Sequence, residues 1–181
     1  MGPTTYLLCQ KPVIGLVMWA ATLCAFPPLF SDAPIELAVA GATVTRSFTV
    51  PVEKGYPLAL NFRFPSVEAR LGDQIVGDRH DEKCNGKARY EEIPEIQRSG
   101  LGRPIPLKVV VRKTADRSVV VEQTFESLCI TSHNGTNAKT RTIGWLTLPI
   151  GDYIAEITNL QAQPGFSGVV TTVSLYGGQG K

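Results

Sequence analysis

The stretch Thr142–Ile157 constrains the fold of this chain more than any other part of the sequence. Leu146 and Leu148 alternate with Thr147, which is the period of a strand that buries one face. Pro149 ends that strand because proline has no backbone N–H to donate, and the Gly-Asp pair that follows supplies turn chemistry. A second alternating run begins at Tyr153. The pattern predicts two strands joined by a corner of a two-sheet sandwich, in which an early tyrosine pins the corner through its hydroxyl.

The rest of the chain carries similar strand signals at fairly even spacing. Thirteen prolines and seventeen glycines fit many short strands with frequent turns better than long helices. The sequence therefore predicts a mainly β protein: an immunoglobulin-like or jelly-roll-type antiparallel β-sandwich of about eight strands, with one short helix or loop insertion. Besides the two strands of the corner, the predicted strands are Ile35–Val39, Thr43–Val50, Tyr56–Phe64, Leu107–Arg112, Ser118–Glu126 and Val169–Tyr176, and Cys129–Thr131 extends or follows the fifth of these.

We assign residues 66–103 to the insertion, because this segment is rich in charges of both signs and poor in aromatic and β-branched residues. Ser66 is a candidate N-cap for a short helix over Val67–Val76. The charged run Arg79–Arg89 is typical of an exposed loop, and loops of this length are usually functional or disordered. The insertion is thus either a recognition surface or a solvated segment without a role.

The N-terminal residues have the three parts of a secretory signal. Lys11 precedes an apolar run, Val13–Phe26, and a Pro-Pro pair then breaks any helix. The run is short for a membrane span, which needs about 20 residues. We expect residues 1–33 to be a signal peptide or a lipoprotein or membrane-anchor segment, and residues 34–181 to be a single β-sandwich domain. The alternative is that the run is a core segment of the domain.

The processing point is ambiguous in the sequence. Cys24 follows Ala-Thr-Leu, which resembles a lipoprotein box, although Leu23 departs from the small residue usual before a lipidated cysteine. If Cys24 is lipidated, residues 25–34 become a tether. Ser-Asp-Ala at 31–33 fits a small-x-small cleavage site, but Pro34 is a poor residue to follow the cut.

Removal of the N-terminal segment leaves two cysteines, Cys84 and Cys129. In an oxidising compartment they are expected to form a disulfide. The two histidines, His80 and His133, each lie four residues from one of these cysteines, and Cys₂His₂ is a valid zinc set, with copper as the other candidate. Because neither segment has helical periodicity, we expect the disulfide, two surface histidines and no metal.

No motif in the chain predicts catalysis. Ser132 and His133 are adjacent, and neighbours in an extended chain point apart, so they do not form a dyad. The sequence has no Gly-x-Ser-x-Gly motif, and its grouped carboxylates lie in the charged insertion. The formal net charge of +2 argues against a dedicated nucleic-acid binder. We therefore expect a protein that is not an enzyme and that has no cofactor.

Four corner motifs together resemble a known group of proteins. They are Thr-Val-Pro at 49–51, Gly-Tyr-Pro at 55–57, Ile-Pro-Leu-Lys at 105–108 and Leu-Pro-Ile-Gly-Asp-Tyr at 148–153. Over residues 35–177 the chain resembles an uncharacterised proteobacterial family of small exported, often lipoprotein-like β-sandwich proteins, catalogued as a domain of unknown function. The resemblance implies a bacterial, periplasm-facing sandwich and supplies no catalytic residue.

The expected function is that of an exported, non-enzymatic protein-interaction module of the periplasm, of an envelope-component or toxin-neutralising type. Its protein partner is unidentified, and membrane attachment would run through the N-terminus. The alternative is a sandwich that binds a small ligand or glycan. The candidate binding surface comprises His80, Tyr90 and Trp145. If Leu146 and Leu148 face the core, Trp145 faces outward; with the opposite assignment it is a core residue. An exposed Trp145 beside other aromatic residues favours ligand binding, and a broad apolar patch near residues 79–103 favours a protein partner.

Overall fold

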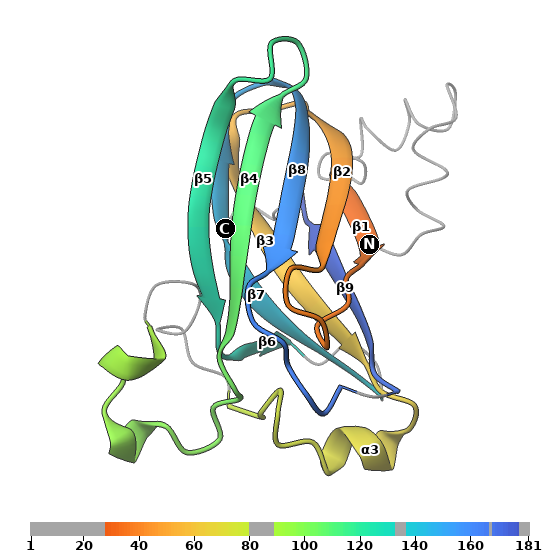
Figure 1. Cartoon of the computed structure of the whole chain (residues 1–181), viewed down its shortest axis with the longest axis vertical. Helices are drawn as coiled ribbons and strands as arrows, with labels where there is room; N and C mark the ends of the chain where they lie inside the picture. Colours follow the sequence, from red (N-terminus) through yellow and green to blue (C-terminus); the bar gives the residue numbers. More distant parts are fainter. Residues whose placement is uncertain (1–27, 80–88, 133–136, 167, 178–181) are drawn as a thin grey trace, which may run out of the picture.

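The described residues fold into two antiparallel sheets packed face to face, which confirms the predicted β-sandwich (Figure 1). The computed structural model describes residues 28–79, 89–132, 137–166 and 168–177. The five-stranded sheet has the order β1-β9-β3-β7-β6, and the four-stranded sheet has the order β2-β8-β4-β5. The strands are β1 (Phe30–Pro34), β2 (Thr43–Val50), β3 (Lys54–Arg63), β4 (Ile105–Lys113), β5 (Val119–Ser127), β6 (Ile130–Ser132), β7 (Ala138–Leu148), β8 (Gly151–Asn159) and β9 (Val170–Leu175). Within these ranges no helix is long and apolar enough to cross a membrane.

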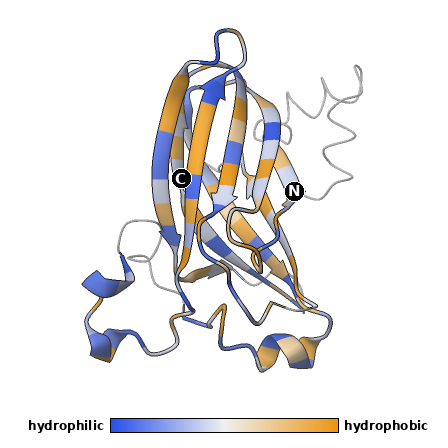
Figure 2. Cartoon of the chain, in the orientation of Figure 1, coloured by the Kyte–Doolittle hydropathy of each residue, from blue (hydrophilic) through white to orange (hydrophobic). Residues whose placement is uncertain are grey.

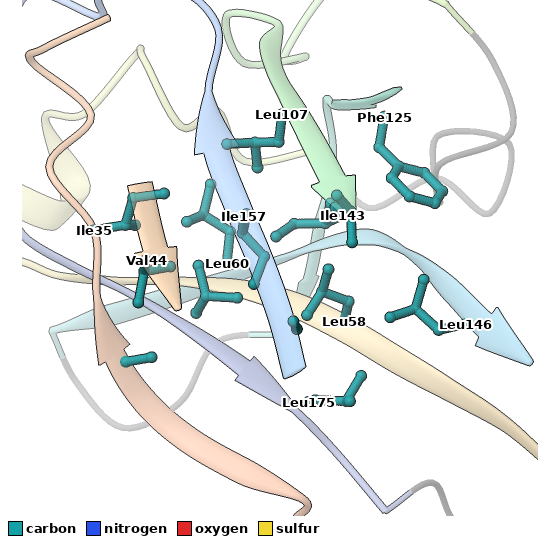
Figure 3. Close-up of a cluster of buried hydrophobic side chains, with 14 of the residues drawn as sticks. Ile35, Val44, Leu58, Leu60, Leu107, Phe125, Ile143, Leu146, Ile157 and Leu175 are labelled. Atoms are coloured by element: carbon teal, nitrogen blue, oxygen red, sulfur yellow. The ribbon is translucent and has the colours of Figure 1, made fainter. Parts of the chain in front are cut away.

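Alternation along the strands builds the core between the sheets. Leu58 and Leu60 of β3 are fully buried and face Leu107 of β4 and Ile157 of β8 across the sandwich (Figure 3). Figure 2 shows apolar and polar stretches along the strands. Burial of each large apolar side chain contributes about 1.5–3 kcal/mol, so this layer stabilises the fold.

The predicted corner joins the two sheets. β7 ends at Leu148 in the five-stranded sheet, and β8 begins at Gly151 in the four-stranded sheet, so the two residues between them cross the sandwich. The Tyr153 hydroxyl donates a hydrogen bond of 3.0 Å to the Pro149 carbonyl, and its ring stacks on Phe48 with centroids 5.8 Å apart. Both the corner and the role of Tyr153 in it are therefore confirmed.

Replacing Tyr153 with Phe is expected to lower the free energy of unfolding by about 1 kcal/mol, because it removes one hydrogen bond and keeps the buried ring. Urea unfolding followed by circular dichroism measures the change. Tyr90→Phe is a suitable control, since the Tyr90 hydroxyl makes no hydrogen bond to a described residue. A Tyr153→Phe variant as stable as the parent chain would show that the hydroxyl does not hold the corner.

The first strand differs from the prediction. Ile35–Val39 is not a strand; β1 lies just before it and pairs with β9. The segment between β1 and β2 is hydrogen-bonded without strand pairing. The Leu37 carbonyl, for example, accepts hydrogen bonds from the Gln163 amide and the Asn159 side chain. β1 thus begins inside the segment assigned to targeting, and the last part of the expected tether belongs to the sheet.

The insertion lies at one end of the sandwich, away from the β4–β5 hairpin loop (Figure 1). Its helix α3 covers Val67–Leu71, which is shorter than predicted, and the Ser66 hydroxyl caps it by accepting from the Ala69 amide at 3.1 Å. The helix ends at Leu71. The Asp73 carboxylate then accepts hydrogen bonds from the backbone amides of Ile75 and Val76, so the chain does not continue as a helix there. Two single turns of 3₁₀-helix follow, η2 (Tyr90–Glu92) and η3 (Glu95–Gln97).

β4 and β5 form an antiparallel hairpin. Val111 pairs with Val121, Val109 pairs with Gln123, and Val119 pairs with Arg112 because the register shifts between Val111 and Arg112.

Candidate functional site

Trp145 lies on the outer face of the five-stranded sheet. Its neighbour Leu146 is 1% exposed in the core, whereas Trp145 is 53% exposed. Trp145 pairs in register with Pro57 of β3, and a Cβ atom on Gly55 would lie 3.6 Å from the indole, so the ring covers that glycine. The core assignment of Trp145 is therefore wrong, and the outward assignment that followed from the two leucines is right.

A second aromatic residue lies on the same face, beside Pro57. The Tyr176 amide donates to the Pro57 carbonyl at 3.0 Å, and its hydroxyl donates to Asn61 Oδ1 at 3.3 Å. The Tyr176 side chain therefore runs along the sheet from Pro57 towards Asn61. We call Trp145, Pro57 and Tyr176 the outer platform. Sequence reasoning missed two of the three, although Pro57 stands between two inward-facing residues of a well-predicted strand and so had to face outward.

Polar side chains continue the outer platform along the same face. Asn61 Nδ2 donates to Ser174 Oγ at 2.9 Å, and Thr140 Oγ1 donates to Asn61 Oδ1 at 3.0 Å. The Asp32 amide also donates to Ser174 Oγ, at 3.0 Å. Together these bonds fix the orientation of the Asn61 amide and tie four strands into one polar surface.

A cleft of about 290 Å³ opens in this polar surface. Asp32 of the β1 bulge and Arg63 at the end of β3 both line it, and both are exposed. The other lining residues are Asn61, Phe62, Ala138, Thr140, Val170, Thr172 and Tyr176. The face thus combines an exposed indole and a half-buried tyrosine with a cleft of amide, hydroxyl and charged groups.

Two buried cations were also missed by sequence reasoning. Lys139 lies at the start of β7 and is fully buried. Its amine lies 2.9 Å from both Asp73 Oδ2 and Asp78 Oδ1, so its charge is balanced by the insertion. No local pattern marks such a residue, because its partners are about 60 residues away.

Arg141 is the second buried cation, and its guanidinium donates to the backbone carbonyls of Ile75, Val76, Arg103 and Ser127. Desolvation lowers the pKa of Arg141 to about 9, and the charge of Asp73 opposes that shift. The group therefore stays protonated at neutral pH. Since it is fully buried, its role is to fasten the insertion to the sandwich.

The predicted candidate residues do not gather at one place. Tyr90 is half-buried in a small cluster with Ile93, Leu128 and Cys129, and its amide donates to Glu126 Oε2 at 2.6 Å. This cluster belongs to the insertion end and does not adjoin Trp145. In the described part of residues 79–103, the exposed large apolar side chain is that of Ile96.

The remaining candidates lie mostly outside the described residues: Cys24, His80, Cys84 and His133. Cys129 is buried and is not a free thiol, and its pairing with Cys84 stays a prediction. Among the residues that the structure describes, no group of three His, Cys, Asp or Glu side chains could hold a metal ion.

A comparison with solved structures finds proteins with a similar fold. A crystal structure of a protein from Sulfurospirillum deleyianum is similar, with a TM-score of 0.60 and 20% identity over 81% of this chain and 95% of that one. An isomalto-dextranase from Arthrobacter globiformis T6, solved with panose, has a TM-score of 0.42 and 15% identity over 80% of this chain and 18% of its own. A likeness at that level carries no argument. No match was found among curated proteins.

The family comparison agrees with the resemblance drawn from the corner motifs. A family model described as "Domain of unknown function (DUF5625)" matches residues 32–177, which is nearly the whole sandwich. The chain therefore belongs to this family.

Proposed function

We propose that this chain is an exported, non-enzymatic sandwich that binds a glycan on the outer face of its five-stranded sheet. The observation that carries the proposal is the outer platform, in which Trp145 is half-exposed and Tyr176 also lines a polar cleft. Export rests on the N-terminal sequence pattern.

The chemistry of this face suits a sugar. A pyranose ring has an apolar C–H face, which packs on an aromatic ring, and a rim of hydroxyl groups, which need hydrogen-bond donors and acceptors in fixed directions. Trp145 and Tyr176 offer rings, whereas Asn61 and the hydroxyl residues bonded to it form an ordered polar floor. The exposed Asp32 and Arg63 side chains line the same cleft. A ligand site of this kind joins apolar area to a few placed polar groups.

A protein-interaction function has weaker support. Stable protein interfaces cover about 800 Å² on each partner and have an apolar centre. At the insertion, Ile96 is 91% exposed, but no broad apolar patch surrounds it within the described residues. Single exposed apolar side chains are normal on protein surfaces.

Isothermal calorimetry of the purified full chain with maltohexaose, cellohexaose and chitohexaose tests the proposal. We expect saturable 1:1 binding of at least one of them, with a free energy of about −4 to −8 kcal/mol. Absence of binding by all three would overturn the glycan function. A stoichiometric protein partner captured from the periplasmic fraction would then favour a protein-interaction module.

The structure also bears on where the exported chain is processed. The Leu29 amide donates to the Leu175 carbonyl at 2.8 Å, Phe30 packs on Phe48 with ring centroids 5.8 Å apart, and Ala33 is fully buried. Cleavage after Ala33 would remove these contacts and the Asp32 wall of the cleft.

We therefore expect the mature chain to begin before Leu29, for instance at a lipidated Cys24, which would attach the domain to a membrane. Intact-mass measurement of the chain recovered from an export-competent bacterium checks this, since each processing point gives a distinct mass. A mature chain that begins at Pro34 would contradict the role of β1 in the sheet.

A further inference from the structure

We infer that the cleft between Asp32 and Arg63 is a second saccharide subsite, so that the ligand is an oligosaccharide that spans the cleft and the outer platform. This inference rests on the proposed glycan function and names the length and contacts of the ligand. Both residues line the cleft, which lies on the same sheet face as Trp145 and includes Tyr176 among its walls. The two surfaces are therefore continuous.

The floor of the cleft is already hydrogen-bonded, and this leaves two groups for a ligand. The Asn61 amide has three partners, Ser174, Thr140 and Tyr176. In contrast, the Asp32 carboxylate accepts one long hydrogen bond, from Thr172 at 3.4 Å, and the exposed Arg63 guanidinium makes no hydrogen bond or ion pair with a described residue. A carboxylate that accepts and a guanidinium that donates match the two functions of a sugar hydroxyl.

The backbone at Asp32 supports the same assignment. Its φ of 52° is the left-handed conformation, which is uncommon for a residue other than glycine and which Asp and Asn adopt most readily. It lies within the irregular register between Phe30 and Ala33 in β1. Strained backbone of this kind gathers at binding sites, where it aims a side chain. Here the bulge keeps Ala33 in the core and places Asp32 at the cleft.

The size of the combined surface sets the length of the ligand. Pro57 and Arg63 are six positions apart on one strand, which corresponds to about 20 Å at ~3.3 Å per residue. One pyranose ring is too short to touch both ends. An extended oligosaccharide can stack on the outer platform and reach the two charged groups of the cleft.

The experiment measures the affinity of the best-bound hexaose and of the matching disaccharide by calorimetry, for the parent chain, Asp32→Asn and Arg63→Gln. Asparagine tolerates the left-handed backbone, so the first variant removes the charge and keeps the bulge. We expect the parent chain to bind the hexaose at least tenfold more tightly than the disaccharide. Each variant is expected to lose about tenfold in hexaose affinity and less than twofold in disaccharide affinity. Arg46→Gln and Glu156→Gln, which change exposed charges on the four-stranded sheet, serve as matched controls.

The outcomes separate this inference from the function on which it rests. Equal affinities of the hexaose and the disaccharide, or unchanged hexaose affinity in both variants, would overturn the second subsite and leave the platform as the glycan site. Loss of the same size in the controls would also overturn it, because the effect would then come from net charge. Failure of the parent chain to bind any hexaose would overturn the glycan function itself.

Discussion

Replacing Arg141 with Met is expected to lower the free energy of unfolding by about 3–5 kcal/mol, which is the usual cost of removing one member of a buried charged network. Met keeps much of the length and apolar stem of the side chain and removes every donor. The carbonyls of Val76, Arg103 and Ser127 then lose the hydrogen bonds that Arg141 now makes. Each buried acceptor left without a partner costs about 1–3 kcal/mol.

The packing around Arg141 leaves little room for relaxation. A Cβ atom added to Gly102 would lie 1.6 Å from Arg141 Nη2 and 2.2 Å from the Val76 carbonyl oxygen. The segments that meet here are therefore held at a spacing that fits this guanidinium beside a glycine.

Urea unfolding and the Tm measure the effect of Arg141→Met. A loss of this size corresponds to a fall in Tm of about 10 °C in a domain of about 150 residues. Arg141→Lys is expected to be intermediate, because an amine cannot reproduce the fork of the guanidinium. Arg46→Met, at an exposed position, is the control and should change stability by less than about 0.5 kcal/mol. An Arg141→Met chain within 1 kcal/mol of the parent would show that the insertion is held by other contacts.

Replacing Trp145 with Ala is expected to weaken binding of the hexaose at least tenfold, equivalent to ~1.4 kcal/mol or more, and to leave the Tm nearly unchanged. The ring is half-exposed and covers Gly55, so its loss removes contact area for a ligand and little of the core. Calorimetry gives the affinity and thermal unfolding gives the stability of the same sample.

Two further variants test whether a loss of affinity in Trp145→Ala comes from the aromatic ring at this position. Trp145→Phe keeps an aromatic face and should retain part of the affinity. Ile150→Ala removes an apolar side chain that is 70% exposed at the corner, and it should bind as the parent does. If Ile150→Ala weakens binding as much as Trp145→Ala, the ligand site is the corner rather than the outer platform.

Local sequence patterns predicted those parts of the fold that depend on residues close together in the chain. The corner at Pro149, the Tyr153 hydrogen bond and the Ser66 cap all depend on near neighbours, and each is present. β1 was missed because its strand character depends on β9, which lies about 140 residues away, and because a left-handed Asp32 breaks its alternation.

The candidate site was predicted in part. Trp145 could be assigned outward from the alternation of its neighbours, whereas Tyr176 joins it only because β9 pairs beside β3. Lys139 and Arg141 read as ordinary polar residues in the sequence, and their burial depends on an insertion that folds back over the end of the sandwich. Tyr90 was chosen for its place in that insertion, but it packs near Leu128 and Cys129 and is not part of the outer platform.

The central claim is that the outer face around Trp145 is where the ligand binds, and the fluorescence of Trp145 tests it most directly. The chain has two tryptophans, Trp19 and Trp145, so the full chain with Trp19→Phe reports Trp145 alone. Titration with the hexaose that binds in calorimetry is predicted to change the intensity and shift the emission maximum to the blue, with the same dissociation constant. Saturable binding in calorimetry with no change in the Trp145 emission would contradict the account, because the ligand would then occupy another surface.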